Sequence, residues 1–186
     1  MQKISAKKVG KELAEVILQW CAPNEMVEFR KKFNIEKDIE KFDQELFYLL
    51  MFLMTYVCQR VFTESKEFTE RLLDTFHKYV YEKKLDLPEQ FSDLMKLEEQ
   101  IRSRYTQYYQ LTKNDPKFLT QQLTYDFLGN VSGKKIEDLR NIEELKKEFT
   151  ECWGKTIFEM QFWVGYMLKD MIDFMTNMKR KYRDPT

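Results

Sequence analysis

The sequence predicts an all-α protein, a helical bundle that forms a single domain over residues 1–186. Glycine and proline are scarce, with 5 and 4 among 186 residues, whereas β-rich chains need such turn residues at short intervals. Apolar residues recur every three to four positions along most of the chain, which is typical of amphipathic helices. Hydrophobic residues make up 43% of the chain and aromatic residues 15%, enough for one packed core. We expect about six to seven helices.

The first three predicted helices lie before residue 62. Ala22-Pro23 ends the first helix, because a residue that precedes proline is pushed out of the helical conformation. Asn24 is suited to cap a short second helix. An apolar stripe then runs from Ile35 to Val61 and predicts a long third helix, buried on nearly all sides in its second half. The apolar face of the first helix consists of Val9, Leu13, Val16, Ile17, Trp20 and Cys21.

Three further helices are predicted between residues 63 and 128. Thr63 or Ser65 begins the fourth helix as a capping residue. Pro88 marks the start of the fifth, since proline is tolerated in the first turn of a helix, and Asp115-Pro116 repeats this signal for the sixth. Residues 129–133, Gly-Asn-Val-Ser-Gly, have the composition of a loop, so we expect the sixth helix to end at Gly129.

The last region, residues 136–181, contains no proline and one continuous apolar stripe. This pattern predicts a long C-terminal helix of about 45 residues, or two helices in tandem with a kink near Gly154. Gly165 lies inside the same pattern, and we expect either a break or the close approach of another helix there. Elsewhere Phe, Leu, Met and Tyr dominate the inward positions and only three alanines occur, so we expect helices held well apart.

Charge and cysteine content argue against several classes of protein. The 31 basic residues balance 31 acidic ones, which removes the electrostatic argument for a nucleic-acid partner. Three dispersed cysteines, Cys21, Cys58 and Cys152, argue against a disulfide framework and for a reducing, cytoplasmic location. The N-terminus lacks the apolar run of a signal peptide. The most apolar run, residues 46–58, is shorter than the ~20 residues of a membrane span, so we expect no transmembrane segment.

Few residues suggest chemistry. The single histidine, His77, has no second ligand at metal-binding spacing, so we expect no metal site, no cofactor and no catalytic residue. Asp74 precedes His77 by one helical turn and could orient it as a general base. The alternative is an ordinary, partly exposed helix histidine with local contacts. The segment from Gly129 to Lys134 has three rather than four residues between its glycines and so departs from the phosphate-binding loop.

A narrow polar stripe crosses the apolar C-terminal helix. Glu159, Tyr166 and Asp170 belong to it, and they are our candidate ligand-binding residues if the stripe faces a cavity. The alternative places the stripe in solvent, with Lys155–Glu159 and Lys169–Asp173 as exposed pairs four residues apart.

Two basic segments are candidates for contact with an anion or a partner. In the first, Arg102, Tyr105 and Tyr109 or Tyr108 come to one helix face, a surface that stacks bases or holds a phosphate. The alternative is a half-buried helix edge with hydrated tyrosine hydroxyls. The second segment is the tail, whose cations are also favoured at a helix C-terminus by the helix dipole. Its candidate residues are Lys179, Arg180, Lys181 and Arg183.

These observations favour a non-enzymatic helical bundle that acts through a protein partner or by self-association, as an adaptor, regulator or assembly factor. The alternative is a binding protein for an apolar or amphipathic small molecule held between the helices, since 10 methionines and many aromatic side chains can line such a pocket. A lesser alternative is binding to nucleic acid or an anionic surface through the basic and aromatic patches.

Overall fold

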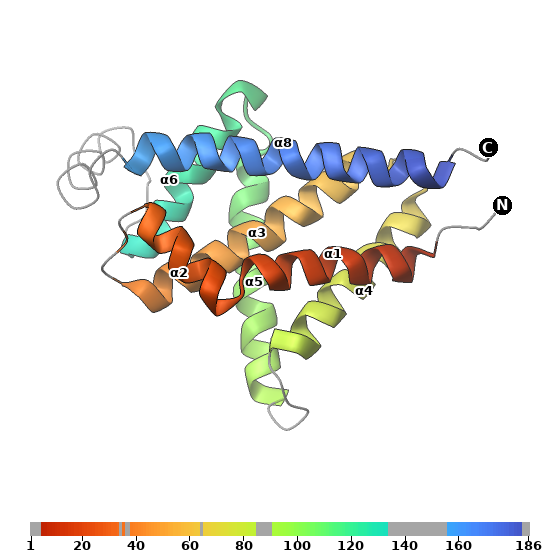
Figure 1. Ribbon diagram of the computed structural model, residues 1–186, viewed down its shortest axis with the longest axis horizontal. Coiled ribbons are helices and arrows are strands. Elements are labelled where there is room, and N and C mark those ends of the chain that lie inside the picture. Colours follow the sequence, from red (N-terminus) through yellow and green to blue (C-terminus); the bar gives the residue numbers. More distant parts are fainter. Residues whose placement is uncertain are drawn as a thin grey trace. The chain divides into compact units, whose positions relative to one another are not determined.

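The computed structural model describes residues 5–33, 35, 38–63, 65–84, 91–133 and 156–183. This part of the chain contains seven α-helices, one short 3₁₀-helix and no strand. The predicted all-α class is therefore confirmed (Figure 1).

The chain divides into two compact units, each made of segments far apart in the sequence. Helices α3 (Ile39–Val61), α5 (Phe91–Leu111) and α8 (Thr156–Arg183) each contribute residues to both units. Unit 1 comprises Met1–Trp20, Leu50–Arg102 and Leu168–Thr186, and unit 2 comprises Cys21–Leu49 and Ser103–Met167.

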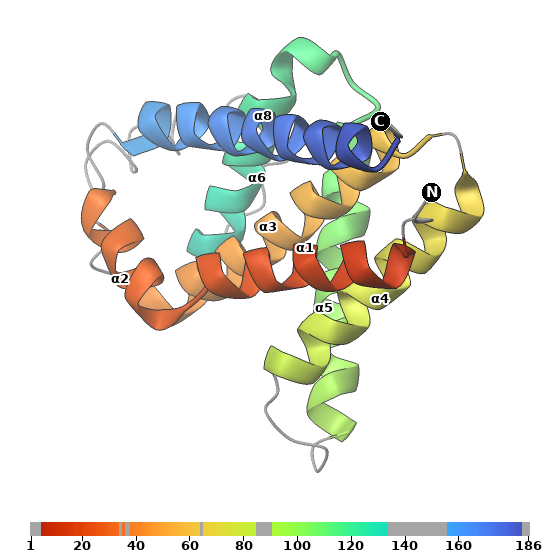
Figure 2. The same cartoon turned by 45° about the vertical axis from the view of Figure 1, so that its right-hand side comes forward.

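In unit 1, α1 (Ala6–Trp20) packs against α4 (Lys66–Lys84), as Figure 2 shows. Gly10 permits this contact, because a Cβ added there would lie 2.6 Å from the Leu72 carbonyl oxygen and 2.9 Å from the Thr75 Cβ. Ala14, one turn later, is fully buried. The expectation that bulky side chains keep all helices apart is thus wrong here, since one missing side chain is enough to bring two backbones together.

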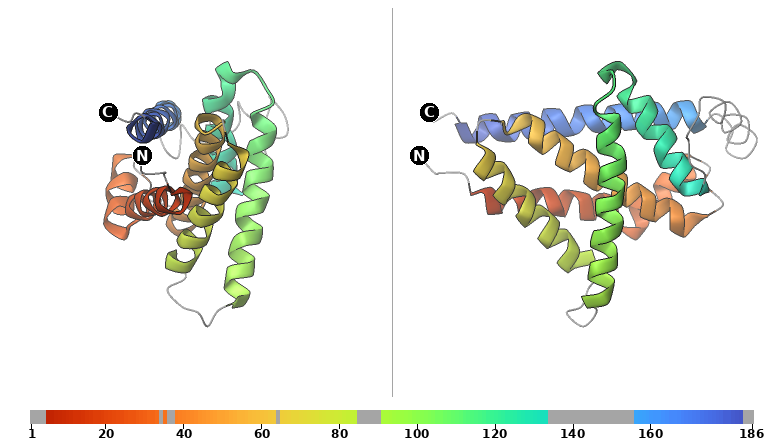
Figure 3. Two further views of the ribbon diagram at one scale, coloured as in Figure 1. Left: turned by 90° about the vertical axis from the view of Figure 1, so that its right-hand side faces the viewer. Right: turned by 180° about the vertical axis from the view of Figure 1, so that it is seen from behind.

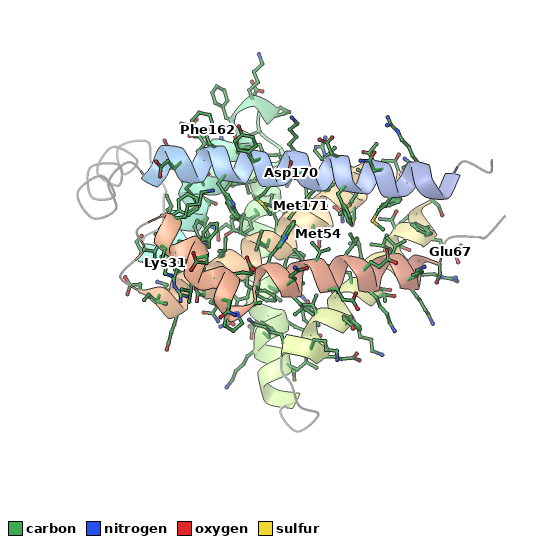
Figure 4. All side chains as sticks on the ribbon, in the orientation of Figure 1. Lys31, Met54, Glu67, Phe162, Asp170 and Met171 are labelled. Carbon is green, nitrogen blue, oxygen red and sulfur yellow. The ribbon has the colours of Figure 1, made fainter. Side chains whose placement is uncertain are left out.

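The second half of α3 and the C-terminal part of α8 supply sulfur-rich side chains to unit 1. The Cys58 thiol donates to the Met175 sulfur at 3.5 Å. Met54 and Met171 are buried as well, and Figure 4 shows Met171 on the side of α8 that faces α3. Flexible thioethers fill irregular space between helices, which explains their use where elements of different direction meet.

Helix α4 begins as the sequence predicts, because the Ser65 Oγ accepts a hydrogen bond from the Phe68 amide. Its inward positions, Leu72, Phe76 and Val80, are fully buried. The N-terminal part of α5 lies beside α4 in this unit (Figure 3). Burial raises the pKa of Tyr81 on α4 to about 12, and Glu98 of α5 adds to the shift.

Unit 2 has an aromatic core to which α2 (Pro23–Lys32), α6 (Leu119–Ser132) and the N-terminal part of α8 contribute. Phe29 of α2 meets the Trp163 ring of α8 edge-on, with ring centroids 4.7 Å apart. Phe42 of α3 makes a similar contact with Phe127 of α6 at 5.4 Å. Such edge-to-face pairs add specific geometry to the hydrophobic burial.

Three helix boundaries in unit 2 differ from the prediction, and one of them is the start of α3, at Ile39 instead of Ile35. Helix α6 continues through Gly129 to Ser132, and Gly133 caps it in the left-handed conformation with φ 73°. Val131 is buried and the Asn130 side chain donates to Gln107, so packing overrides the loop-like composition. At α2, the residue before the helix is Ala22 with no side-chain cap bond, and not Asn24. Pro23 opens the helix because its missing amide is needed by no partner there.

The sixth predicted start is a short 3₁₀-helix, η1 (Pro116–Phe118), which leads directly into α6. The Asp115 side chain caps it by accepting from the Lys117 amide. The long C-terminal helix is present as α8, whereas residues 134–155, which include Gly154 and the predicted start at 136, lie outside the described residues. Within the described residues, no helix has the length and apolar character needed to cross a membrane.

Candidate functional site

The most enclosed charged group among the described residues is the carboxylate of Glu45 in unit 2. Glu45 is 3% exposed and lies on the apolar face of α3, between Phe42 and Leu49. Arg104 of α5 holds it with two hydrogen bonds, from Nε to Oε2 at 2.6 Å and from a terminal nitrogen to Oε1 at 2.5 Å. This two-point geometry matches the planar guanidinium to the carboxylate, and the hydrogen bonds raise the pKa of Arg104.

Two tyrosines lie near this ion pair. Burial raises the pKa of Tyr48 to about 12, and the Glu45 charge adds to the effect. Burial likewise raises the pKa of Tyr108, which is completely buried, above the usual range of a phenol. Both phenols therefore stay protonated at neutral pH. They can donate or accept hydrogen bonds but cannot act as phenolate bases.

A chain of amide side chains extends from Tyr108 toward α6. The Asn130 amide lies 3.5 Å from the Tyr108 hydroxyl and donates to Gln107 at 3.2 Å. Gln107 in turn donates to the Asp126 carboxylate at 3.0 Å. Burial raises the pKa of Asp126. These bonds connect α5 and α6, and the Glu45–Arg104 pair connects α3 and α5.

The network combines the paired charges of Glu45 and Arg104 with protonated phenols. We interpret it as a structural network that holds α3, α5 and α6 together. The Glu45 carboxylate is occupied by Arg104 at both oxygens, which leaves it poorly placed to accept a proton from a substrate. A satisfied polar network of this kind fixes how helices pack. Glu45 is not among the site residues predicted above, although it stands three residues after Phe42 in the apolar stripe, a spacing that places it on the buried face.

His77 in unit 1 is half-buried. Its Nε2 lies 3.2 Å from the Thr55 hydroxyl, and its ring contacts Phe76 edge-on at 5.1 Å between centroids. Burial lowers the pKa of His77 to about 4, although a backbone hydrogen bond to Leu73 and the Asp74 charge act in the opposite direction. A histidine with this pKa is a weak base at pH 7 and is neutral. The Thr55 contact joins α4 to α3 and is not local, and the role of His77 stays a prediction.

The candidate ligand-binding residues lie on the outside of α8. Glu159, Tyr166 and Asp170 are all exposed, Tyr166 at 63%. A ligand that touched these three side chains would lie on the surface of α8 and not between helices. Small-molecule binding in the interior therefore has no support from these residues, and it stays a prediction.

The predicted basic and aromatic face on α5 is divided by burial. Arg102 is exposed, whereas Tyr105 and Tyr109 are half-buried, with ring centroids 6.3 Å apart. On the same helix, Arg104 binds the Glu45 carboxylate and Tyr108 is fully buried. The sequence alone does not show which of these arginines and tyrosines are buried, because burial depends on which helix covers each face of α5.

The tail cations continue α8 up to Arg183. Lys179 donates from Nζ to the carbonyl oxygen of Val61, the last residue of α3. A cation at this place is favoured by the partial negative charge of the helix C-terminus. Arg180 is exposed, and the side chains of Lys181 and Arg183 lie outside the described residues.

A second feature of α8 is apolar and exposed. Phe162 and Tyr166, one turn apart, are 69% and 63% exposed. Figure 4 shows Phe162 on the side of α8 opposite Met171. In η1, Phe118 is 52% exposed, and Thr120, two residues later, lies beside α8, with its Cγ2 3.9 Å from where a Cβ of Gly165 would be. We call the exposed stripe formed by Glu159, Phe162, Tyr166 and Lys169 the outer face of α8.

Comparison with known protein families, characterised proteins and solved structures finds no match for this chain. Among the described residues, no three His, Cys, Asp or Glu side chains gather as a metal site would require.

Proposed function

We propose that the protein acts without catalysis, by binding a protein partner through the outer face of α8, as an adaptor, regulator or assembly factor does. The observation that carries this proposal is the exposure of Phe162 and Tyr166, at 69% and 63%, on adjacent turns of one helix. Aromatic side chains dominate the binding energy of many protein interfaces. Burying them on binding also removes the unfavourable exposure of large apolar surface to water.

The polar groups of the described residues support a role without catalysis. Glu45 is paired with Arg104, and His77 has a lowered pKa and lies beside Thr55. Burial raises the pKa of the Cys58 thiol far above the range of a reactive cysteine. A cytoplasmic location is part of the same proposal, and the three dispersed cysteines support it.

Site-specific photocrosslinking in cells tests the proposal. The crosslinking amino acid benzoylphenylalanine replaces Phe162 in the full chain, and a control variant carries it at Glu67, an exposed position of α4 with 74% side-chain exposure. We expect irradiation to attach a second polypeptide to the position 162 variant and not to the position 67 variant. Failure of position 162 to crosslink, or equal crosslinking at both positions, would overturn the proposal.

A further inference from the structure

The outer face of α8 has the spacing of a coiled-coil seam. Glu159, Phe162, Tyr166 and Lys169 follow one another at steps of three, four and three residues, the alternation found in a seven-residue repeat. All four side chains are exposed. The stripe spans about 15 Å along the helix axis, since each residue of a helix rises about 1.5 Å.

Among the described residues of unit 2, neighbouring helices pack against α8 on both sides of this stripe. On one side, Trp163 packs against Phe29 of α2 with ring centroids 4.7 Å apart. On the other side, Gly165 lies next to Thr120 of α6. Phe162 and Tyr166 thus lie between two sides of α8 that pack against other helices. A second helix is the element that fits a stripe of this shape.

We propose that the occupant of this seam is a second copy of the chain, whose α8 packs antiparallel to the first with the two-fold axis at the level of Val164. The proposal rests on the function proposed above and names the partner. In this register Phe162 lies opposite the partner's Tyr166, and Tyr166 opposite the partner's Phe162. The aromatic side chains then form the two central layers of a self-complementary interface.

The charges of Glu159 and Lys169 favour the antiparallel pairing of two α8 helices over a parallel pairing. The antiparallel register sets Glu159 opposite the partner's Lys169 and Lys169 opposite the partner's Glu159, so that two ion pairs flank the aromatic layers. A parallel pairing sets each glutamate against a glutamate and each lysine against a lysine. Like charges placed across an interface are unfavourable, so the sequence of this face disfavours the parallel pairing.

The stripe is small for an interface. Two exposed aromatic side chains supply only part of the ~800 Å² that each partner buries in a standard specific complex. We therefore expect a weak dimer that forms with a dissociation constant on the order of 10 to 100 µM.

Sedimentation velocity of the full chain over a concentration series tests the pairing through charge reversal. We expect Glu159→Lys and Lys169→Glu each to weaken dimerisation about tenfold, because each change turns both flanking ion pairs into repulsive ones. The double variant Glu159→Lys/Lys169→Glu restores dimerisation, and so does an equimolar mixture of the two single variants. Glu67→Lys, a charge reversal at an exposed position of α4, leaves the dissociation constant unchanged.

Several outcomes would overturn the proposal. A wild-type chain that stays monomeric up to about 500 µM would exclude self-association, and single reversals without effect would exclude this register. Crosslinking at position 162 separates these failures from failure of the proposed function. A monomeric chain that crosslinks to a polypeptide of another mass has a different partner on the same face, whereas absence of both signals removes both proposals.

Discussion

Arg104 of α5 donates two hydrogen bonds to the carboxylate of Glu45 on α3, and Glu45 is 3% exposed. Removing one partner of a buried pair leaves the other charge without compensation, which costs far more than the pair itself contributes. We therefore expect Arg104→Ala to lower the free energy of unfolding by about 3 kcal/mol. Urea denaturation followed by circular dichroism measures this change.

Two variants serve as controls for the ion pair. Arg71→Ala, which removes an exposed ion pair with Glu67 on α4, should change the free energy of unfolding by less than about 1 kcal/mol. The apolar double variant Glu45→Leu/Arg104→Met should recover most of the stability lost in Arg104→Ala, because neither charge then remains buried. A double variant as unstable as Arg104→Ala would contradict the argument.

Acid should destabilise the protein through His77. Burial lowers the pKa of this histidine to about 4 in the folded chain, whereas an unfolded histidine titrates near 6.5. Between these values the unfolded chain binds more protons, so stability falls as the pH falls from about 6.5 to about 4. We expect the loss due to His77 to reach roughly 2 to 3 kcal/mol.

The variant His77→Gln isolates this contribution, since glutamine keeps a hydrogen-bonding group for Thr55 and does not titrate. Denaturation curves between pH 7 and pH 4 should show a smaller loss of stability for the variant than for the wild type. Because the chain has one histidine, its pKa can also be followed directly by NMR. A measured pKa above 6 would refute the expected pH dependence.

Two glycines should respond to alanine in opposite directions. At Gly10 a Cβ would meet the Leu72 carbonyl oxygen at 2.6 Å, so we expect Gly10→Ala to destabilise the chain by about 1 to 3 kcal/mol. At Gly165 the nearest atom lies at 3.9 Å, an ordinary contact. There alanine should stabilise α8 by up to about 1 kcal/mol through helix propensity. Thermal unfolding of both variants measures the difference, and a stabilised Gly10→Ala would contradict the close packing of α1 and α4.

The all-α class and most helix positions follow from the sequence because they depend on local signals. Ser65 caps α4 and Asp115 caps η1, since each acts on amides two or three residues away. The end of α6 does not follow from such signals. The segment from Gly129 to Gly133 has loop composition, yet Val131 is buried in unit 2, and a tertiary contact of this kind outweighs local preference.

The candidate site was predictable only in part. Periodicity alone places Glu45 on the apolar face of α3, but its partner Arg104 lies 59 residues further on, and no local pattern joins the two. The polar residues Glu159 and Asp170 in the sequence indicate that Tyr166 belongs to a polar stripe. The sequence does not identify Phe162 as a surface residue, because an aromatic residue in an apolar helix is normally part of the core. The exposure of Phe162 depends on which sides of α8 the helices α2 and α6 cover.

We expect the chain to associate through the outer face of α8. NMR spectra of ¹⁵N-labelled protein recorded over a dilution series test it most directly, because amide shifts and line widths report which residues enter an interface. We predict concentration-dependent changes concentrated at Glu159, Phe162, Tyr166 and Lys169, with the exposed residues Lys66, Glu67 and Glu70 of α4 unaffected. Changes confined to other helices, or spectra that do not vary with concentration, would contradict the claim.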